Sequence, residues 1–496
     1  MKNTIHTYIL PAILSATLIT TSCSHFEEMN IDPNNIDVVV PNSLMNPLLY
    51  DMGTFSSNRN YDFTWQLMQV GFPYPATATG VHRYDITPTA GNGTWNKGYT
   101  WLRSISEMEE AAINKEQPIY LAVAKTLKAY SAGMLTDAFG DMPFSEAIKL
   151  DEGISTPKFD EQQEIYRVLI EGLEEANSIY ASTDSDMSGG DILFGNSGAN
   201  NENISSKEKW RKFNNSLLMR LLLRTSKRTE IDSYNRLKEI IDAPDRYPVF
   251  NSNAEAAILK ISGLSPFNYA WNRRQDYTLT ITKAEFFVDM LNDYEDPRRP
   301  FFMSEANSIP PGTNLGYKGI PAAHDPAATF NFTPSIPNPD LMIPQNLGTV
   351  IHEIIMPYAE VEFIKSEVYL HFGDLENAEE AYKKGTIAGI TQWVGISSPG
   401  ETYFDNPLTA FNGTLERIMN QKYLALYMCD YQQWFEYRRT GFPVLPKTEH
   451  MLHGGEMPKR FMYHDRLSIT NPENYKIASD KLEHGDSPLS RVWWEK

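Results

Sequence analysis

Two stretches of the chain place apolar residues at the spacing of an amphipathic helix. Residues 118–134, "PIYLAVAKTLKAYSAGM", carry one apolar stripe and a second stripe of small residues, Ala122, Ala129 and Gly133. Small residues would let another helix approach closely. Another helix is predicted from about Asp160, where Asp160 can cap the first turn and Gln163 can reciprocate.

A further helix is predicted in "WRKFNNSLLMRLLLRTSKR", residues 210–228, where Trp210, Phe213, Leu217 and Leu221 recur at helical spacing. This segment also gathers six basic residues: Arg211, Lys212, Arg220, Arg224, Lys227 and Arg228. They could form an anion site, but a solvated or ion-paired helix face is the simpler interpretation.

The segment from Pro357 to Val394 predicts a helical hairpin. Two helical patterns flank the turn Phe372-Gly373-Asp374, and Asp374 can cap the second helix. Helices of this length around such a turn, with Ala and Tyr at close-packing positions, look like a tetratricopeptide unit. The repeats are degenerate and scattered. We therefore predict a mainly α fold, a tetratricopeptide-like superhelix of helical hairpins with insertions.

Two regions lack a helical pattern. Residues 182–206 are polar and rich in Gly and Asn, and indicate an exposed loop. Residues 262–349 hold many Pro, Gly and Asn, with a single predicted helix near "TKAEFFVDML". An irregular insertion of this length is unusual unless it is functional, so we expect it to carry the ligand region.

The N-terminus predicts export. Lys2 precedes an apolar run from Tyr8 to Ile19, which is too short for a bilayer that needs ~20 apolar residues. Small residues then lead to Cys23, as in lipoprotein signals. We expect a signal peptide at 1–22, a lipidated tether at 23–50, and one helical domain at 51–496.

Charge and cysteine content narrow the function. The chain of 496 residues has 44 Lys and Arg against 63 Asp and Glu, a formal charge of −19 that disfavours nucleic acid. It has two cysteines. With Cys23 lipidated, Cys429 has no disulfide partner and is predicted to be a small buried hydrophobe.

No catalytic motif is recognisable. A glycoside hydrolase would need a carboxylate pair ~5 to 9 Å apart, and none of the 63 carboxylates lies in such a motif. His352-Glu353 lacks the second His of a zinc protease helix. We therefore expect no enzyme activity, no cofactor and no metal site.

Several motifs together resemble the SusD/RagB family of Bacteroidetes outer-membrane lipoproteins, in particular its second SusD-like subgroup. They occur in the right order over nearly the whole mature chain: "NIDPNN", "LTDAFGDMPFSEA", "FDEQQEIY", "KWRKFNNSLLMRLLLR", "DPRRP", "FGDLENAEEAY", "QKYLALYMCDYQQWFEYRRTGFP" and "MPKRFMYHDRLSITNPENY". Any one of these motifs alone would be weak.

The resemblance implies a lipoprotein on the outer leaflet that binds cargo and passes it to a SusC-type TonB-dependent transporter. The cargo would be an oligosaccharide, with a peptide as the alternative; a protein-interaction scaffold is a further hypothesis. In "DYQQWFEYRRTGFP", residues 430–443, the resemblance implies a scaffold helix with inward aromatics and arginines that satisfy buried carboxylates or helix-end carbonyls.

A sugar site needs aromatic rings with Asn, Asp and Arg around them. The segment "SPFNYAWNRRQDYTLT" is the first candidate, with Tyr269, Trp271, Asn272, Arg273, Arg274 and Tyr277, although Trp271 could equally fill the core. Further candidates are aromatic and histidine side chains outside the predicted helices: Tyr74, His82, Tyr84, Trp95, Tyr317 and Trp393. Trp101 is expected in the core.

Overall fold

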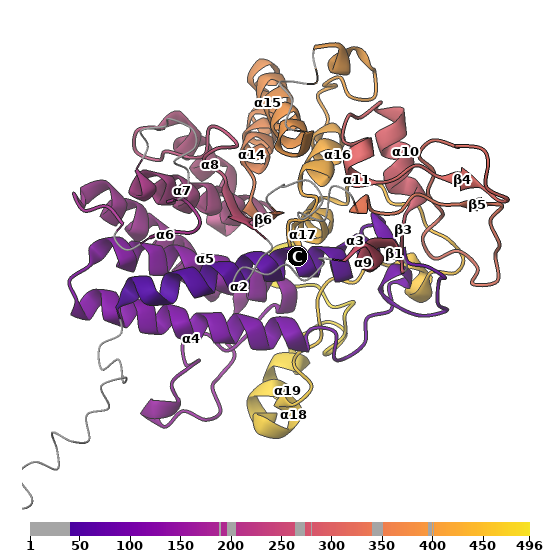
Figure 1. Cartoon of the computed structure of the whole chain (residues 1–496). Coiled ribbons are helices and arrows are strands. Elements are labelled where there is room, and N and C mark those ends of the chain that lie inside the picture. The colour runs from indigo at the N-terminus through magenta and orange to yellow at the C-terminus, as the bar shows by residue number, and fades with distance from the viewer. Residues whose placement is uncertain are drawn as a thin grey trace, which may run out of the picture. The chain divides into compact units, whose positions relative to one another are not determined.

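Helices dominate the computed structural model, which describes residues 40–187, 190–195, 205–262, 273–278, 280–339, 351–394, 399 and 401–496. Contacts group residues 41–496 into one unit. Its longer helices are α2 (Pro41–Arg59), α4 (Asn92–Asn114), α5 (Pro118–Phe139), α6 (Gln162–Ser182), α7 (Ser206–Arg224), α8 (Ser233–Asp242), α14 (Tyr358–His371), α15 (Leu375–Val394), α16 (Leu415–Ala425) and α17 (Gln432–Thr440). The predicted mainly α fold is confirmed (Figure 1).

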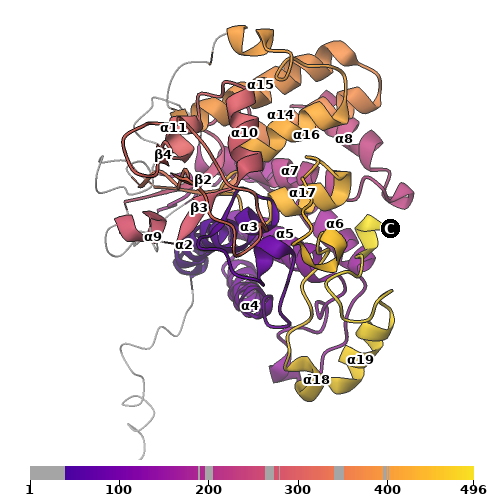
Figure 2. The same cartoon turned by 90° about the vertical axis from the view of Figure 1, so that its right-hand side faces the viewer.

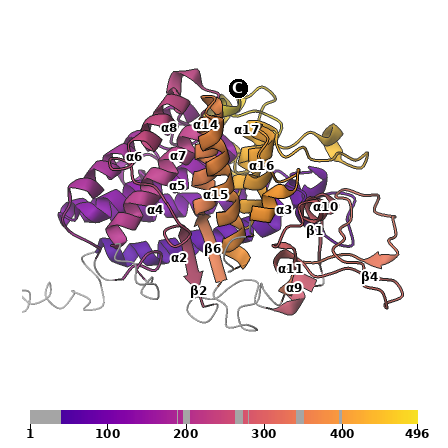
Figure 3. The same ribbon diagram turned by 90° about the horizontal axis from the view of Figure 1, so that it is seen from above.

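Successive helices pack side by side as pairs. Figure 3, seen from above, shows α4 to α8 on one side of the unit. On the other side are the loops around β1 (Gly71–Pro73), β4 (Asn307–Ser308), α10 (Glu285–Asp293) and α11 (Arg299–Phe302). Because α2 begins at Pro41, residues 41–50, assigned to the tether from the sequence, are helical in the structure.

Small residues set the spacing around α5, as the sequence predicts. A Cβ added at Gly133 would lie 3.2 Å from Leu221 of α7, and one added at Gly98 of α4 would lie 2.6 Å from Leu135 of α5. Larger side chains at these positions would force the helices apart. The helix ends at Gly140, whose φ of 82° is a conformation that glycine adopts readily.

The cap predicted for α6 is wrong. The helix starts at Gln162, and its N-cap residue Glu161 makes no side-chain capping bond. The backbone N–H of Gln162 donates to the Asp141 carboxylate at 2.9 Å. The Asp160 carboxylate instead accepts hydrogen bonds from the backbone N–H groups of Phe144 and Ser145, at 2.9 and 2.7 Å. A loop that precedes α6 by more than ten residues therefore takes the acceptor that a local rule assigns to the helix.

The predicted hairpin is present as α14 and α15. Gly373 turns the chain at a φ of 77°, and the Asp374 carboxylate accepts from the backbone N–H of Asn377 at 3.2 Å. Gly385 and Phe363 meet where the two helices pack, since a Cβ at Gly385 would lie 3.1 Å from the Phe363 ring.

The irregular insertion contains more regular structure than predicted. Besides α10 (Glu285–Asp293), the described residues form the short helices α9 (Arg274–Thr278) and α11 (Arg299–Phe302). Within the insertion, β3 (Ile281–Lys283) pairs antiparallel with β1 (Gly71–Pro73), and β4 (Asn307–Ser308) pairs antiparallel with β5 (Phe332–Thr333). The strands β2 (Ala257–Ile261) and β6 (Ile351–Met356), which flank the insertion, pair with each other. Short turns of helix lack the length that a periodicity argument needs.

Lys283 joins this insertion to the helical scaffold. It lies at the end of β3, and its Nζ is 3.7 Å from the ring centroid of Trp65 and 3.0 Å from the Tyr427 hydroxyl. Burial lowers the pKa of Lys283 well below its usual value. Aromatic faces supply the attraction for the ammonium that a carboxylate would otherwise give.

Candidate functional site

The double arginine of "DYQQWFEYRRTGFP" is structural. Arg438 donates to Glu495 at 2.9 Å and to the backbone carbonyl of Asp137 at 2.7 Å. Arg439 donates to Glu367 at 2.6 Å and to Glu436 at 2.8 Å. The helix ends at Gly441 with a φ of 81°. The predicted role in satisfying buried carboxylates is confirmed.

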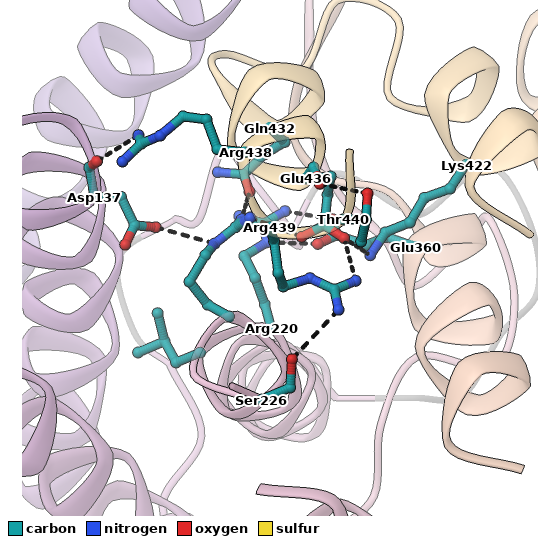
Figure 4. Close-up of polar contacts among 12 residues, drawn as sticks. Asp137, Arg220, Ser226, Glu360, Lys422, Gln432, Glu436, Arg438, Arg439 and Thr440 are labelled. Carbon is teal, nitrogen blue, oxygen red and sulfur yellow. Dashed lines mark hydrogen bonds and ion pairs between the residues drawn. The ribbon is translucent and has the colours of Figure 1, made fainter. Parts of the chain in front are cut away.

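Two arginines of α7, Arg220 and Arg224, also form buried ion pairs beside this double arginine (Figure 4). Arg224 pairs with Asp137 at 3.3 Å and with Glu436 at 2.7 Å, and Arg220 pairs with Glu360 at 2.6 Å. Lys212 forms an ion pair with Glu255. The ion-paired interpretation is therefore the right one for Lys212, Arg220 and Arg224, because each already has a carboxylate partner.

The turn before α17 is held from a distant part of the chain. Met428 and Asp430 have positive φ values of 66° and 28°, and the Asp430 carbonyl accepts from Asn60 and Thr64, both at 2.8 Å. Cys429 between them is fully buried and free, as predicted, and burial raises the pKa of its thiol.

Four of the predicted ligand residues lie on segments that adjoin the β1–β3 strand pair. Tyr74 follows β1 and donates its N–H to Thr280 at 2.9 Å, next to the segment that holds Arg273 and Tyr277. Tyr317 lies three residues before Ile320, which bridges to Ala284 after β3. Tyr74, Arg273, Tyr277 and Tyr317 thus belong to segments that the β1–β3 pair and the Ala284–Ile320 bridge connect.

Their exposure differs. Tyr277 is fully buried and stands edge-on to Tyr61 at 5.9 Å, so its ring has no free face. Tyr74 and Tyr317 are half-buried, and Arg299 lies 5.7 Å from the Tyr317 ring. Arg273 is exposed and pairs with Asp276 at 2.6 Å. Tyr74 and Tyr317 keep ring surface for a ligand.

The residues around His82 are buried and hold several segments of the chain together. His82 and Tyr84 are buried, and His82 stacks on Phe72 at 5.5 Å. Desolvation, with the neighbouring Arg83 charge, lowers the pKa of His82 to about 4. Arg83, which sequence reasoning did not single out, donates to the carbonyls of three segments: Thr77 at 2.6 Å, His324 at 2.6 Å and His450 at 3.0 Å.

Of the remaining predicted residues, some lie outside the described part of the chain and others pack in the core. Tyr269, Trp271, Asn272 and Cys23 lie outside the described residues. Trp101 is buried as expected, and the half-buried Trp393 stands edge-on to Phe302 and Tyr427 at 5.4 and 5.5 Å.

Trp95 lines a surface cavity of about 510 Å³. The cavity lies between the start of α4 and the segment that leads into α18 (Leu467–Thr470) and α19 (Pro472–Asp480). These two short helices lie at the bottom of Figure 2. Its other lining residues are mostly polar: Asn92, Asn96, His464, Asp465, Arg466, Leu467 and Thr470. We call it the Trp95 cavity.

Some side chains that line the Trp95 cavity bond one another, and others have no such bond among the described residues. Asn92 donates to Asp465 at 3.0 Å, and the His464 ring nitrogen lies 3.1 Å from the same carboxylate. Within the described part of the chain, the exposed side chains of Asn96 and Arg466 make no hydrogen bond or ion pair. They can therefore bond a ligand without losing a protein partner.

Trp95 itself is only 7% exposed, because it packs against Phe139, Tyr99 and Tyr463 at 5.0, 5.0 and 6.2 Å. It cannot present the broad stacking face that the sequence suggested. The cavity is suited to hydrogen bonding of hydroxyl groups, with amide, carboxylate, imidazole and guanidinium groups around its mouth.

Across the described ranges, no three His, Cys, Asp or Glu side chains are grouped to hold a metal ion. Among the same residues, no helix combines the length and the hydropathy that a membrane crossing requires.

The helical scaffold with loop-borne polar sites defines a SusD-like protein. The family "SusD-like_2: Starch-binding associating with outer membrane" matches residues 33–464, and the chain belongs to it. It is therefore a SusD-like, outer-membrane-associated nutrient-binding protein. Because this family consists of non-catalytic binding proteins, the prediction that the chain is not an enzyme is confirmed.

Solved structures share the fold. A chitin-binding protein is 22% identical with a TM-score of 0.74, and the match covers 91% of this chain and 98% of that one. A SusD homologue from Bacteroides fragilis is 24% identical with a TM-score of 0.72, covering 92% and 99%. An outer-membrane protein from Bacteroides vulgatus, described as probably involved in nutrient binding, is 19% identical with a TM-score of 0.72, covering 92% and 100%. The search of curated proteins found no match.

Proposed function

We propose that this protein captures an oligosaccharide at the cell surface and hands it to a SusC-type TonB-dependent transporter. The Trp95 cavity carries the proposal, because its Asn, Asp, His and Arg side chains suit sugar hydroxyls and two of them are free. Membership in a family described as starch-binding, and the likeness to a chitin-binding protein, support a saccharide as cargo.

The half-buried Tyr74 and Tyr317, with Trp271 nearby in sequence to Arg273, form the second part of the proposed binding surface. These residues would supply ring faces, and the Trp95 cavity would supply hydrogen bonds. A long saccharide could contact more than one of these places, whereas a monosaccharide would occupy one.

The binding test starts from an array of glycans and peptides, from which one soluble ligand is chosen. Arg466→Ala should weaken binding of that ligand by ~1.5 to 3 kcal/mol, the usual worth of a charged hydrogen bond. Trp271→Ala should cost ~1 to 3 kcal/mol of binding with an unchanged melting temperature if the ring is a stacking platform. Isothermal titration calorimetry measures both affinities.

Arg103→Ala is the matched control, since Arg103 is an exposed arginine of α4 that does not line the cavity. Binding of peptides alone on the array would contradict a glycan cargo. A sharp fall in melting temperature for Trp271→Ala, with normal binding by the folded fraction, would assign Trp271 to the core.

Lipidation of Cys23 is proposed as the anchor, because each buried methylene contributes ~0.8 kcal/mol and three acyl chains hold a protein stably. Cys23→Ser should move the protein from the membrane fraction to the soluble fraction in cells that lack the transporter.

The transporter partner is tested by purification. Wild-type protein extracted in mild detergent should co-purify with a large outer-membrane barrel. A mutant that stays with the membrane, or a wild-type protein that purifies alone, would contradict the anchor or the partner respectively.

A further inference from the structure

A second cavity, of about 450 Å³, lies between helices α4, α5 and α6 and the loop 144–158. Its lining residues are Leu102, Ser106, Lys128, Phe144, Ser145, Ala147, Ile148, Lys149, Lys158, Asp160, Glu164 and Val168, none of which lines the Trp95 cavity. The volume is within the ~300 to 1,000 Å³ of small-molecule sites. We call it the lysine cavity.

The rim of the lysine cavity is built before any ligand binds. Asp160 accepts hydrogen bonds from Phe144 and Ser145, including one from the Ser145 hydroxyl at 2.7 Å. Glu146 accepts from the backbone N–H of Lys158 at 2.9 Å. These bonds join the two ends of the loop, so little ordering entropy remains to oppose binding.

Positive charge exceeds available negative charge at the mouth. Lys128, Lys149 and Lys158 face two lining carboxylates, of which Asp160 already accepts three loop hydrogen bonds and Glu164 pairs with Arg167 at 2.5 Å. This concentration of lysine is notable in a chain of net charge −19. An anionic group would meet three ammonium groups there.

The partners that these lysines do have are weak. Lys128 lies 3.3 Å from Glu109, which Lys125 also contacts at 3.6 Å. Lys149 and Glu152 are 3.4 Å apart and both exposed, and Lys158 lies 3.7 Å from Asp160. The exposed Lys149–Glu152 pair contributes only ~0 to 1 kcal/mol, so an incoming anion can replace it. The other two pairs are long, and their lysine side chains are 38% and 57% exposed.

The inner wall is apolar and holds a strained residue. Leu102, Phe144, Ala147 and Val168 line it, and Ile148 stands at the loop with a φ of 63° and 41% exposure. A β-branched side chain is a genuine outlier in the left-handed region. Such strain concentrates at ligand-binding segments, and here it keeps an apolar side chain beside the lysines.

We propose that the lysine cavity binds a small anion that carries an apolar or aromatic body, with the ammonium groups on the anion and the wall of Leu102, Phe144 and Ile148 on the body. This site is independent of saccharide capture, since no lining residue is shared with the Trp95 cavity. It would let the protein take an acidic ligand in addition to a neutral glycan.

Two fluorescent dyes test the proposal on the folded protein. 8-Anilinonaphthalene-1-sulfonate carries an anionic group on an aromatic body, and N-phenyl-1-naphthylamine has nearly the same body without the charge. The sulfonate dye should bind saturably and more weakly as salt rises. The double variant Lys128→Gln, Lys158→Gln should lower its affinity at least fivefold while changing that of the neutral dye less than twofold.

Ile148→Gly removes one apolar side chain of the wall at a backbone conformation that glycine accepts, so it should weaken binding of both dyes without loss of folding. Lys97→Gln with Lys383→Gln is the control, because both lysines are exposed and lie outside the cavity. The proposal is overturned if the sulfonate dye does not saturate, if the lysine variant binds it like wild type, or if both dyes weaken equally in that variant.

Discussion

Replacing Glu436 by Gln should lower the free energy of unfolding by about 3 to 5 kcal/mol, the usual effect of removing one partner from a buried ion pair. The Glu436 carboxylate accepts from Arg224 at 2.7 Å, from Lys422 at 2.8 Å and from Arg439 at 2.8 Å. These three cations hold the pKa of Glu436 well below its usual value. Urea unfolding at pH 7 measures the loss.

Lys422 accounts for most of the expected loss. In this variant Arg224 still has its ion pair with Asp137, and Arg439 still has its ion pair with Glu367. Lys422, by contrast, is 1% exposed and pairs with Glu436 alone among the described residues. Adding Lys422→Met to Glu436→Gln should therefore restore part of the stability, because the uncompensated charge is gone.

Glu380→Gln is the control, since Glu380 is exposed and pairs with Lys384 one helical turn away. That change should cost less than about 0.5 kcal/mol. A loss below about 1 kcal/mol for Glu436→Gln would show that the network does not stabilise the packing of α7, α16 and α17.

The lowered pKa of Glu436 also sets how its contribution to stability changes with pH. A depressed pKa means that the contribution is present above the unfolded value of 4.5 and is lost as pH falls.

The local features of the fold could be predicted from the sequence. The helix at 118–134, the hairpin turn at Gly373 and Asp374, and the stop at Gly441 follow from periodicity, capping and positive φ, which depend on residues a few positions apart. The small-residue stripe of α5 also packs against another helix as predicted, because close helix packing needs small side chains whichever helix approaches.

Features that depend on distant parts of the chain could not be predicted. Asp160 has the local sequence of a helix cap, yet the loop at Phe144 and Ser145 uses its carboxylate. Lys283 is a charged residue beside a strand, and only the packing of Trp65 and Tyr427 around it explains its burial. Local rules describe what a side chain can bond, whereas tertiary contacts decide what it does bond.

The lining of the Trp95 cavity also depends on distant parts of the chain, so the sequence predicted only part of it. Trp95 was singled out as an aromatic among Gly and Asn, but Asn96 and Arg466 were not, and Arg466 appeared only inside a family motif. They face the same cavity although 370 positions separate them. A polar residue beside a singled-out aromatic is a usable signal for Asn96, while Arg466 becomes visible only when the C-terminal segment is folded against α4.

Glu353 should make the protein less stable as pH rises from about 4.5 to 8. It is buried on β6, where its carboxyl group accepts a hydrogen bond from the Ser57 hydroxyl, and its other oxygen has no partner among the described residues. Desolvation raises the pKa of Glu353 from 4.5 to about 8. Because the folded pKa is above the unfolded one, the unfolded state releases its proton first, and stability falls between these two values.

Glu353→Gln removes this dependence, since a neutral amide replaces a carboxyl group that is neutral in the folded protein at pH 7. The variant should equal wild type near pH 4.5 and exceed it at pH 7 by about 3 kcal/mol, the linkage of ~1.36 kcal/mol per pH unit over that range. The difference between variant and wild type, measured by urea unfolding from pH 4.5 to 8, cancels the contributions of other carboxylates. A difference that stays constant over this range would mean that Glu353 is ionised in the folded protein, and that the orphan oxygen has found a cation or water outside the described residues.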